Sequence, residues 1–271
     1  MATHLGNTDP FKFAGLLETK KESFKFSVGS ASARIDHRGK VYIFGNKWKK
    51  ATFGLFSQTK SHLKTQNIPE NPKKPIKYIG VLPPNDPFCV YDNIFGIDIS
   101  GAYHAAALKL GYFTQELKDK HINSGKMERL QAFGATAKNS QEFVYEKGEL
   151  IEVNRVKSEL RPFFMTCAYY VGEALEDCRD ELGEDFLFFW VDCVFFKKTE
   201  ENIKKVNAIF AKLGFEAKED KTDFVIFRTF KKHYEIERST GKVVKSYKFS
   251  RNNDRERNRD KHAKNIINKL K

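Results

Sequence analysis

The sequence contains few cysteines, and their spacing argues against a zinc site. The four cysteines stand in apolar surroundings and no two form a CxxC pair: Cys89, Cys167, Cys178 and Cys193. Cysteine pairs at short spacing are typical of zinc sites, whereas scattered apolar cysteines are typical of buried thiols in a reducing compartment. We therefore expect no zinc and free thiols.

The sequence also lacks long apolar runs. No segment approaches the roughly 20 apolar residues that a membrane-spanning helix requires, and residues 1–6 do not show the basic-then-apolar pattern of a signal peptide. A hydrophobic content of 40% with 25 phenylalanines indicates a globular protein of one large or two small domains. We expect a cytoplasmic protein without a membrane partner.

Positive charge is unevenly distributed along the 271 residues, whose net charge is +13. Residues 1–90 carry 15 lysines and arginines against 6 acidic residues, and residues 245–271 carry 10 against 3. Residues 91–244 carry 23 against 26. Basic flanks around a mildly acidic centre suit a bound nucleic acid and a cation site between them. The alternative is that the lysines only confer solubility.

One aspartate interrupts an apolar run. Residues 187–196 are apolar or aromatic except for Asp192, which predicts a buried strand or a tight hairpin. A carboxylate there costs several kcal/mol unless it is paired or binds a metal, although an aspartate in a turn could satisfy its oxygens locally. Asp98 lies in similar surroundings within residues 94–100. Two converging carboxylates on strands would suit hard divalent cations.

The N-terminal region has short β-like runs separated by polar turns. These runs predict a small antiparallel sheet and comprise residues 24–28, 41–44 and 51–56. Aromatic residues alternate with lysines at 11–13 and 46–50, a pattern typical of a surface for single-stranded nucleic acid but also of half-buried strands. Prolines mark residues 69–87 as a loop or linker.

The remaining pattern predicts an α+β fold, with an antiparallel sheet that has helices on one face. We expect strands at 89–100, 223–229 and 232–237, and helices within 102–140, at 159–182 and from the N-cap Thr199 to Gly214. The charged tail 250–271 should be a short exposed helix or disordered.

Four short motifs resemble those of family B DNA polymerases and occur in that family's order. Asp98 is followed five residues later by Tyr103, as in motif A. Lys126 is followed seven later by Phe133 and then Gly134, as in motif B. Residues 191–194 resemble the second half of motif C, and residues 231–234 resemble the Lys-Lys-Arg-Tyr motif. The resemblance covers about half the chain and is greatest to the small protein-primed bacteriophage branch.

The resemblance implies a DNA polymerase-like nucleotidyltransferase that extends a primer with dNTPs, encoded by a phage or another mobile element. Asp98, Asp192 and the backbone carbonyl of Ile99 would hold two Mg²⁺ or Mn²⁺ ions. The ring of Tyr103 would lie under the sugar and exclude a 2′-hydroxyl.

The other motif residues would bind substrate. The resemblance places Lys126, Phe133 and Gly134 at the nucleotide, with Lys118 or Lys120 as a second triphosphate contact. It places three residues on the primer–template backbone: Lys231, Lys232 and Tyr234.

The resemblance also implies a division of the chain. A basic β-rich region with a proline-rich linker (1–88) would precede palm (89–103), fingers (104–150), palm (151–238) and a minimal thumb (239–271). No part resembles a proofreading exonuclease, so dependence on a processivity or priming protein is expected.

The sequence departs from the family pattern at five places: His104, Gln131-Ala132, Phe133, Trp190 and Cys193. Trp190 stands where the family has the first acid of motif C. These departures leave two alternatives open. One is a primase or template-independent terminal transferase, and the other is a catalytically lapsed palm that only binds nucleic acid.

Overall fold

The computed structural model describes residues 2–29, 32–45, 50–73, 89–219, 224–228 and 232–248. The chain divides into two compact units. The first unit comprises Met1–Lys74 and Leu110–Cys167, and the second comprises Pro75–Lys109 and Ala168–Lys271. Lys231, the tail 250–271 and most of the proline-rich segment lie outside the described residues.

A six-stranded sheet forms the core of the first unit. Its strands, in spatial order, are β1 (Ala2–Gly6), β4 (Lys40–Gly45), β3 (Ser32–His37), β2 (Phe24–Gly29), β7 (Asn139–Glu146) and β8 (Glu149–Lys157). The predicted small antiparallel sheet is therefore larger than expected, and it is mixed because β1 runs parallel to β4.

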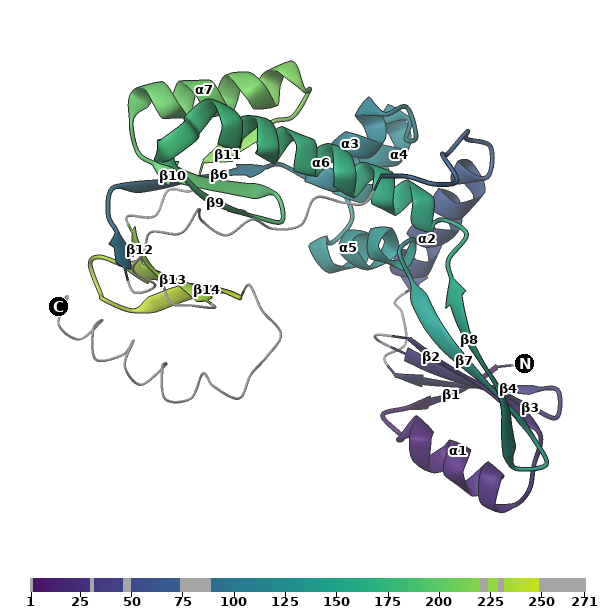
Figure 1. Cartoon of the computed structure of the whole chain (residues 1–271). Helices are drawn as coiled ribbons and strands as arrows, with labels where there is room; N and C mark the ends of the chain where they lie inside the picture. Colours follow the sequence, from purple (N-terminus) through teal and green to yellow (C-terminus); the bar gives the residue numbers. More distant parts are fainter. Residues whose placement is uncertain are drawn as a thin grey trace. The chain divides into compact units, whose positions relative to one another are not determined.

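Helix α1 (Pro10–Thr19) covers one face of this sheet (Figure 1). The side chain of Asp9 caps its first turn by accepting hydrogen bonds from two backbone N–H groups. Ala14 and Leu17 of α1 pack against Phe24 and Phe26 of β2, which alternate with exposed Lys25. The strand period of two thus places the aromatic rings on the helix side.

One expectation for the first unit was wrong, and another is confirmed. Residues 51–56, predicted as a strand, belong to helix α2 (Lys50–Leu63), because buried Thr52, Leu55 and Thr59 recur at helical spacing. Residues 102–140 contain three helices, so the helices predicted within this range are confirmed, and only the last residues of the range belong to a strand. The three helices are α3 (Ala102–Lys109), α4 (Gln115–Ile122) and α5 (Lys126–Ala135), and β7 begins at Asn139.

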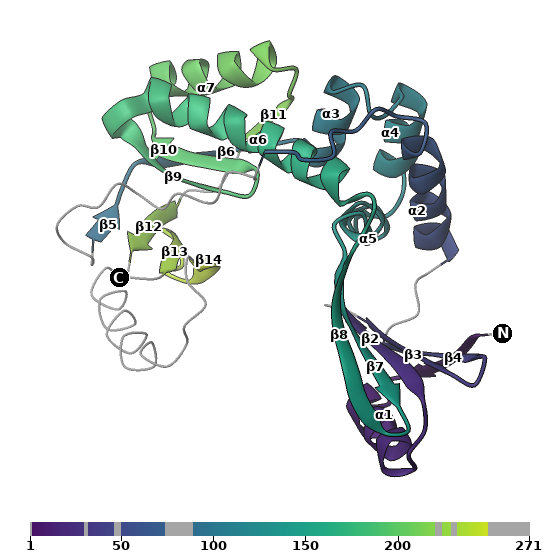
Figure 2. The same cartoon turned by 45° about the vertical axis from the view of Figure 1, so that its right-hand side comes forward.

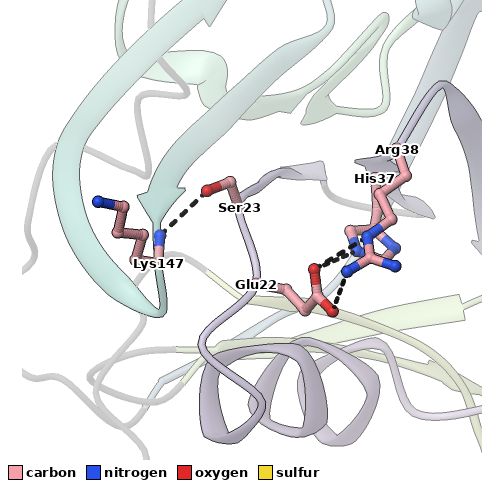
Figure 3. A network of polar contacts seen from close by, with 5 residues as sticks. All are labelled: Glu22, Ser23, His37, Arg38 and Lys147. Carbon is pink, nitrogen blue, oxygen red and sulfur yellow. Dashed lines mark hydrogen bonds and ion pairs between the residues drawn. The ribbon is translucent and has the colours of Figure 1, made fainter.

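The β7–β8 hairpin is fastened to the segment before β2. Figure 3 shows the backbone N–H of Lys147 donating to the hydroxyl of Ser23 at 3.0 Å. The carboxylate of Glu22 accepts hydrogen bonds from Arg38 at 2.6 Å and contacts the ring nitrogen of His37 at 3.2 Å. The bond from Lys147, with one from the backbone N–H of Gly148 to the carbonyl of Glu22 at 2.9 Å, joins the hairpin to the N-terminal sheet, whereas the Glu22 side chain holds the turn between β3 and β4.

Aromatic rings fill the helical part of the first unit. Phe113 lies 5.6 Å from Phe163 and 6.0 Å from Phe133, centroid to centroid. Fully buried His121 of α4 shares a 2.9 Å hydrogen bond with Thr59 of α2, and burial lowers the pKa of His121 to about 4. His121 is therefore neutral at physiological pH and serves packing.

The second unit is built on a four-stranded antiparallel sheet in the order β11 (Ala217–Glu219), β6 (Ile94–Ile99), β10 (Cys193–Lys197) and β9 (Phe186–Trp190). Helices α6 (Arg161–Leu182) and α7 (Glu200–Lys212) lie on one face (Figures 1 and 2). The short 3-10 helix η1 (Gly183–Asp185) leads from α6 into β9. The predictions for 159–182 and for the Thr199-capped helix are confirmed.

The chain order of this sheet is strand, helix, two strands, helix, strand, which is a split β-α-β arrangement of the ferredoxin-like kind. The first connection, from β6 to α6, carries α3 to α5 and the β7–β8 hairpin as an insertion. None of the helices in the described part of the chain is long and apolar enough to span a bilayer.

A second four-stranded sheet packs on the face of the first that the helices leave open. Its order is β14 (Val243–Lys248), β13 (Lys232–Glu237), β12 (Phe224–Arg228) and β5 (Cys89–Tyr91). Phe224 and Ile226 of β12 join Phe188 and Phe195 in one apolar cluster. The strands predicted at 223–229 and 232–237 are confirmed, and so is the α+β class.

Candidate active site

The two aspartates that the sequence singled out lie next to each other in the second unit. Asp98 of β6 is directly opposite Cys193, the first residue of β10. Asp192 is the residue just before Cys193, so it lies at the start of β10, close to Asp98. The backbone N–H of Ile99 donates to the carbonyl oxygen of Asp192 at 2.8 Å. Neighbouring strands of one sheet therefore hold both residues.

The turn that carries Asp192 is strained. Val191 has φ 60°, which is rare for a β-branched residue. The N–H of Asp192 donates to the carbonyl of Trp190 at 2.8 Å and closes a three-residue turn around Val191. Such a conformation costs about 1–3 kcal/mol and occurs mostly where a functional geometry requires it.

Burial and the neighbouring charge make Asp192 a weak acid. Burial above all, then the negative charge of Asp98 and a hydrogen bond between the two side chains, together raise the pKa of Asp192 to about 7. The positive charge of Lys245 acts in the opposite direction on this pKa. Two half-buried carboxyl groups in contact thus repel each other unless a proton or a cation lies between them.

Strand alternation places Asp98 on the face of the sheet opposite the helices. Ile97 and Ile99 are fully buried, and Asp98 alternates with them. Cys193, opposite Asp98, joins the apolar cluster of the second sheet, which fixes the direction of this face. On the other side of β6, exposed Lys218 of β11 is also directly opposite Asp98.

The second sheet contributes two charged residues on the side that faces this site. His233 of β13 stacks on Phe188 of β9, with ring centroids 4.6 Å apart. Glu235 shares the face of His233, and it is directly opposite Lys245 of β14. Glu235 is only 3% exposed, so a buried carboxylate and a cation lie on the face turned toward the β9–β10 hairpin.

Two residues of the predicted DNA contact lie on the other face of β13. Lys232 and Tyr234 alternate with His233 and therefore point away from Phe188. The ammonium of Lys232 lies 5.9 Å from the ring of Tyr234, and that ring stacks on Phe227. The structure does not bring this pair to the aspartates, and Lys231 lies outside the described residues.

Of the residues predicted to bind the nucleotide, Tyr103 belongs to the same unit as the aspartates. It is half-buried in the first turn of α3, which begins three residues after Ile99. Lys118, Lys126, Phe133 and Gly134 belong to the first unit, and their relation to the aspartates stays a prediction.

Phe133 has a definite place in its own unit. Its side chain is 3% exposed and contacts the rings of Phe113, Phe163 and Phe164. It is a core residue of α5, while Lys126 and Gly134 on the same helix are exposed and Lys118 of α4 is half-buried. A direct ring contact with a nucleotide, as the motif implied for Phe133, does not agree with this burial.

The donor set fits a hard cation that also binds substrate oxygens. Within the described ranges, no three His, Cys, Asp or Glu side chains gather closely enough to form a metal site by themselves. Asp98 and Asp192 supply carboxylate oxygens, and the carbonyl of Ile99 is the backbone oxygen that the resemblance adds. Mg²⁺ commonly binds through one or two carboxylates together with substrate phosphates, so two carboxylates suffice.

Sequence reasoning missed Lys218, Glu235 and Lys245. No motif marks them, and Lys218 stands on a three-residue strand whose residues are all exposed. The strand register shows Lys218 opposite Asp98 and Glu235 opposite Lys245, whose charge acts on Asp192.

Comparison with models of known protein families gives no match for this chain, and comparison with curated proteins gives none either.

Proposed function

We propose that the protein is a nucleotidyltransferase of the DNA polymerase type, which adds dNTPs to the 3′-hydroxyl of a primer without a proofreading exonuclease. The observation that carries the proposal is the contact between Asp98 and Asp192, half-buried on adjacent strands of the second unit. The two residues are far apart in the sequence, and the pairing of β6 with β10 brings them together, as the palm of a polymerase requires.

The electrostatics of the pair support a cation site. Burial and then the charge of Asp98 raise the pKa of Asp192, and a divalent cation would relieve the repulsion that a proton otherwise relieves. Asp98, Asp192 and the carbonyl of Ile99 would hold Mg²⁺ or Mn²⁺. Such ions neutralise phosphate charge and favour ionisation of the primer hydroxyl.

The finer assignment follows the resemblance. The split β-α-β sheet with α6 and α7 is the palm, α3 to α5 are small fingers, and the segment after Arg238 is a minimal thumb. Tyr103, which stands five residues after Asp98, excludes ribonucleotides. Exposed Lys126 and half-buried Lys118 contact the triphosphate, and Phe133 supports α5 from the core instead of touching the nucleotide.

Primer extension tests the proposal. Purified protein, a primed DNA template, four dNTPs and Mg²⁺ or Mn²⁺ should give extended primers. Asp98→Asn and Asp192→Asn should each abolish extension, whereas Asp177→Asn, an exposed aspartate on α6, should not. Extension that survives in either site variant would remove the assigned roles.

Two further conditions separate the related activities. Omission of the template should stop incorporation; incorporation of a single dNTP without template would indicate a terminal transferase. Omission of the primer should also stop it, and synthesis from rNTPs without primer would indicate a primase. Binding of DNA without any metal-dependent incorporation would indicate a lapsed palm.

A further inference from the structure

Lys218 occupies a position that no motif predicted. It is the middle residue of β11 and stands directly opposite Asp98 in the antiparallel register. Directly opposite residues of an antiparallel pair have their side chains on the same face, with Cβ atoms about 4.5–5.5 Å apart. The Lys218 side chain therefore rises beside the Asp98 carboxylate, on the face that the helices do not cover.

The ammonium of Lys218 is available to a ligand. The side chain is exposed, and none of the ion pairs found within the described part of the chain involves Lys218. Lys245, the other cation near the pair, differs because it is directly opposite the buried carboxylate Glu235. The residue opposite Lys218 is Asp98, which is itself a proposed cation ligand.

The charges lie in a defined order along this face. Asp98 stands between Lys218 on β11 and the β10 side, where Asp192 lies, so the lysine is beside Asp98 and away from Asp192. Shortly after Asp98, β6 leads into α3, so the positive end of that helix lies at the same end of the strand. An anion held at the Asp98 end would meet Lys218, the start of α3 and any cation on the carboxylates.

We propose that Lys218 binds the phosphate groups of the incoming nucleotide, an inference that rests on the proposed function. Lysine acts toward phosphate as a flexible point charge on a long side chain. Tyr103, the residue proposed to lie under the sugar, stands five residues after Asp98 in the first turn of α3, so sugar and phosphates fall at the same end of β6. Lys218 is thus a palm contact to the phosphates, in addition to the lysines of α4 and α5.

The test compares Lys218→Ala and Lys218→Arg with wild type. A matched control is Lys212→Ala, which removes an exposed lysine from α7 on the opposite face of the sheet. Steady-state extension gives KM for dATP and kcat on a fixed primer–template, and the Kd for the primer–template is measured separately. Calorimetry gives the Kd for dATP with Ca²⁺ present, without any turnover.

We expect Lys218→Ala to raise both KM and Kd for dATP about tenfold, the size of one lost charge-assisted contact. The kcat and the primer–template Kd should stay within about twofold, Lys218→Arg should retain most of the affinity, and Lys212→Ala should resemble wild type. A merely structural lysine would not give this division between KM and kcat.

The outcomes separate this inference from the proposed function. If wild type extends primers and Lys218→Ala leaves KM and Kd for dATP unchanged, the phosphate contact is wrong and the polymerase activity stands. If wild type extends nothing but binds dATP with an affinity that depends on Lys218, the contact stands and the polymerase proposal is wrong. An equal loss in Lys212→Ala would attribute the effect to general charge and overturn the inference.

Discussion

Glu22 in the first unit and Asp192 in the second are both half-buried carboxyl residues next to the end of a strand, but their neighbours have opposite character. Glu22 lies between His37 and Arg38, and the hydrogen bond with His37, aided by Arg38, lowers the pKa of Glu22. Asp192 lies in contact with Asp98, and burial together with that charge raises its pKa. The first cluster is balanced, whereas the second has an excess of negative charge.

This difference distinguishes a cluster whose charges balance from one that suits the cation site we propose. The Glu22 carboxylate holds the turn between β3 and β4, beside the residue to which the β7–β8 hairpin is bonded, and needs nothing further (Figure 3). The aspartate pair, preceded by strained Val191, opposes folding until something neutralises it. Catalytic and metal-binding sites commonly contain such residues although these residues lower the stability of the folded protein. The contrast predicts that substitutions in the two clusters act in opposite directions.

The largest expected effect is on activity. Asp192→Asn removes one of the two carboxylates that would hold the cations, and primer extension should fall about 1000-fold or more, because cation binding supplies several kcal/mol of stabilisation to the transition state. Glu22→Gln removes a carboxylate of the balanced cluster and should leave kcat within about twofold. The measurement is single-turnover extension with both variants at saturating primer. A comparable loss in both would erase the distinction.

Stability should change in the opposite sense. A raised pKa means that the folded state binds a proton which the unfolded state releases, so wild type without metal should lose stability as pH rises from about 4 to about 7. Because Asp192→Asn removes the charge that folding would bury at this position, this variant should be more stable than wild type by on the order of 2 kcal/mol at pH 8. Glu22 behaves in reverse, since its contribution is present above its unfolded pKa and is lost on acidification.

Urea unfolding of wild type, Asp192→Asn and Glu22→Gln at pH 5 and pH 8 in EDTA measures both trends. Glu22→Gln should lower the unfolding midpoint, most clearly at pH 8. Addition of Mn²⁺ at pH 8 should raise the midpoint of wild type and leave that of Asp192→Asn unchanged. A wild type that is most stable at pH 8 without metal, and insensitive to Mn²⁺, would contradict the cation site.

The sequence predicts those residues of the candidate site that stand out from their immediate neighbours in the chain. An aspartate within an apolar run predicts an unusual carboxylate wherever the chain places it, and Thr199 before an amphipathic period predicts α7 to within a residue or two. Lys218 gives no such signal, because its strand has three exposed residues and its importance comes from the register with Asp98.

The errors in the fold have equally specific causes. In residues 51–56 the apolar pattern was compatible with a strand, and the helix is decided by buried threonines, one of which bonds His121 far along the chain. The sequence does not predict the β7–β8 hairpin, because β8 is almost wholly exposed and its residues do not alternate between buried and exposed. Its Lys147-Gly148 turn, with φ 50° and 81°, was the available signal.

The smallest expected effect concerns backbone strain and again contrasts the two clusters. Val191 and Lys147 both have positive φ and both sit in the turn of a hairpin, but only Val191 is β-branched. Glycine adopts this conformation without strain, so Val191→Gly should stabilise the metal-free protein by about 1 kcal/mol, or about 2–4 °C in Tm for a chain of this size. Lys147→Gly should gain less, because an unbranched side chain tolerates the left-handed region better.

The same substitution should affect catalysis only at the second site. A flexible turn positions the carboxylate of Asp192 less firmly, so Val191→Gly should lower kcat several-fold while raising Tm, and Lys147→Gly should leave kcat unchanged. Thermal unfolding in EDTA and single-turnover extension on the same preparations measure both. If Val191→Gly lowers Tm, packing of the Val191 side chain stabilises the protein by more than the strained backbone of Val191 destabilises it. The turn would then be an ordinary hairpin tip, and Asp192 would owe its place to the sheet register alone.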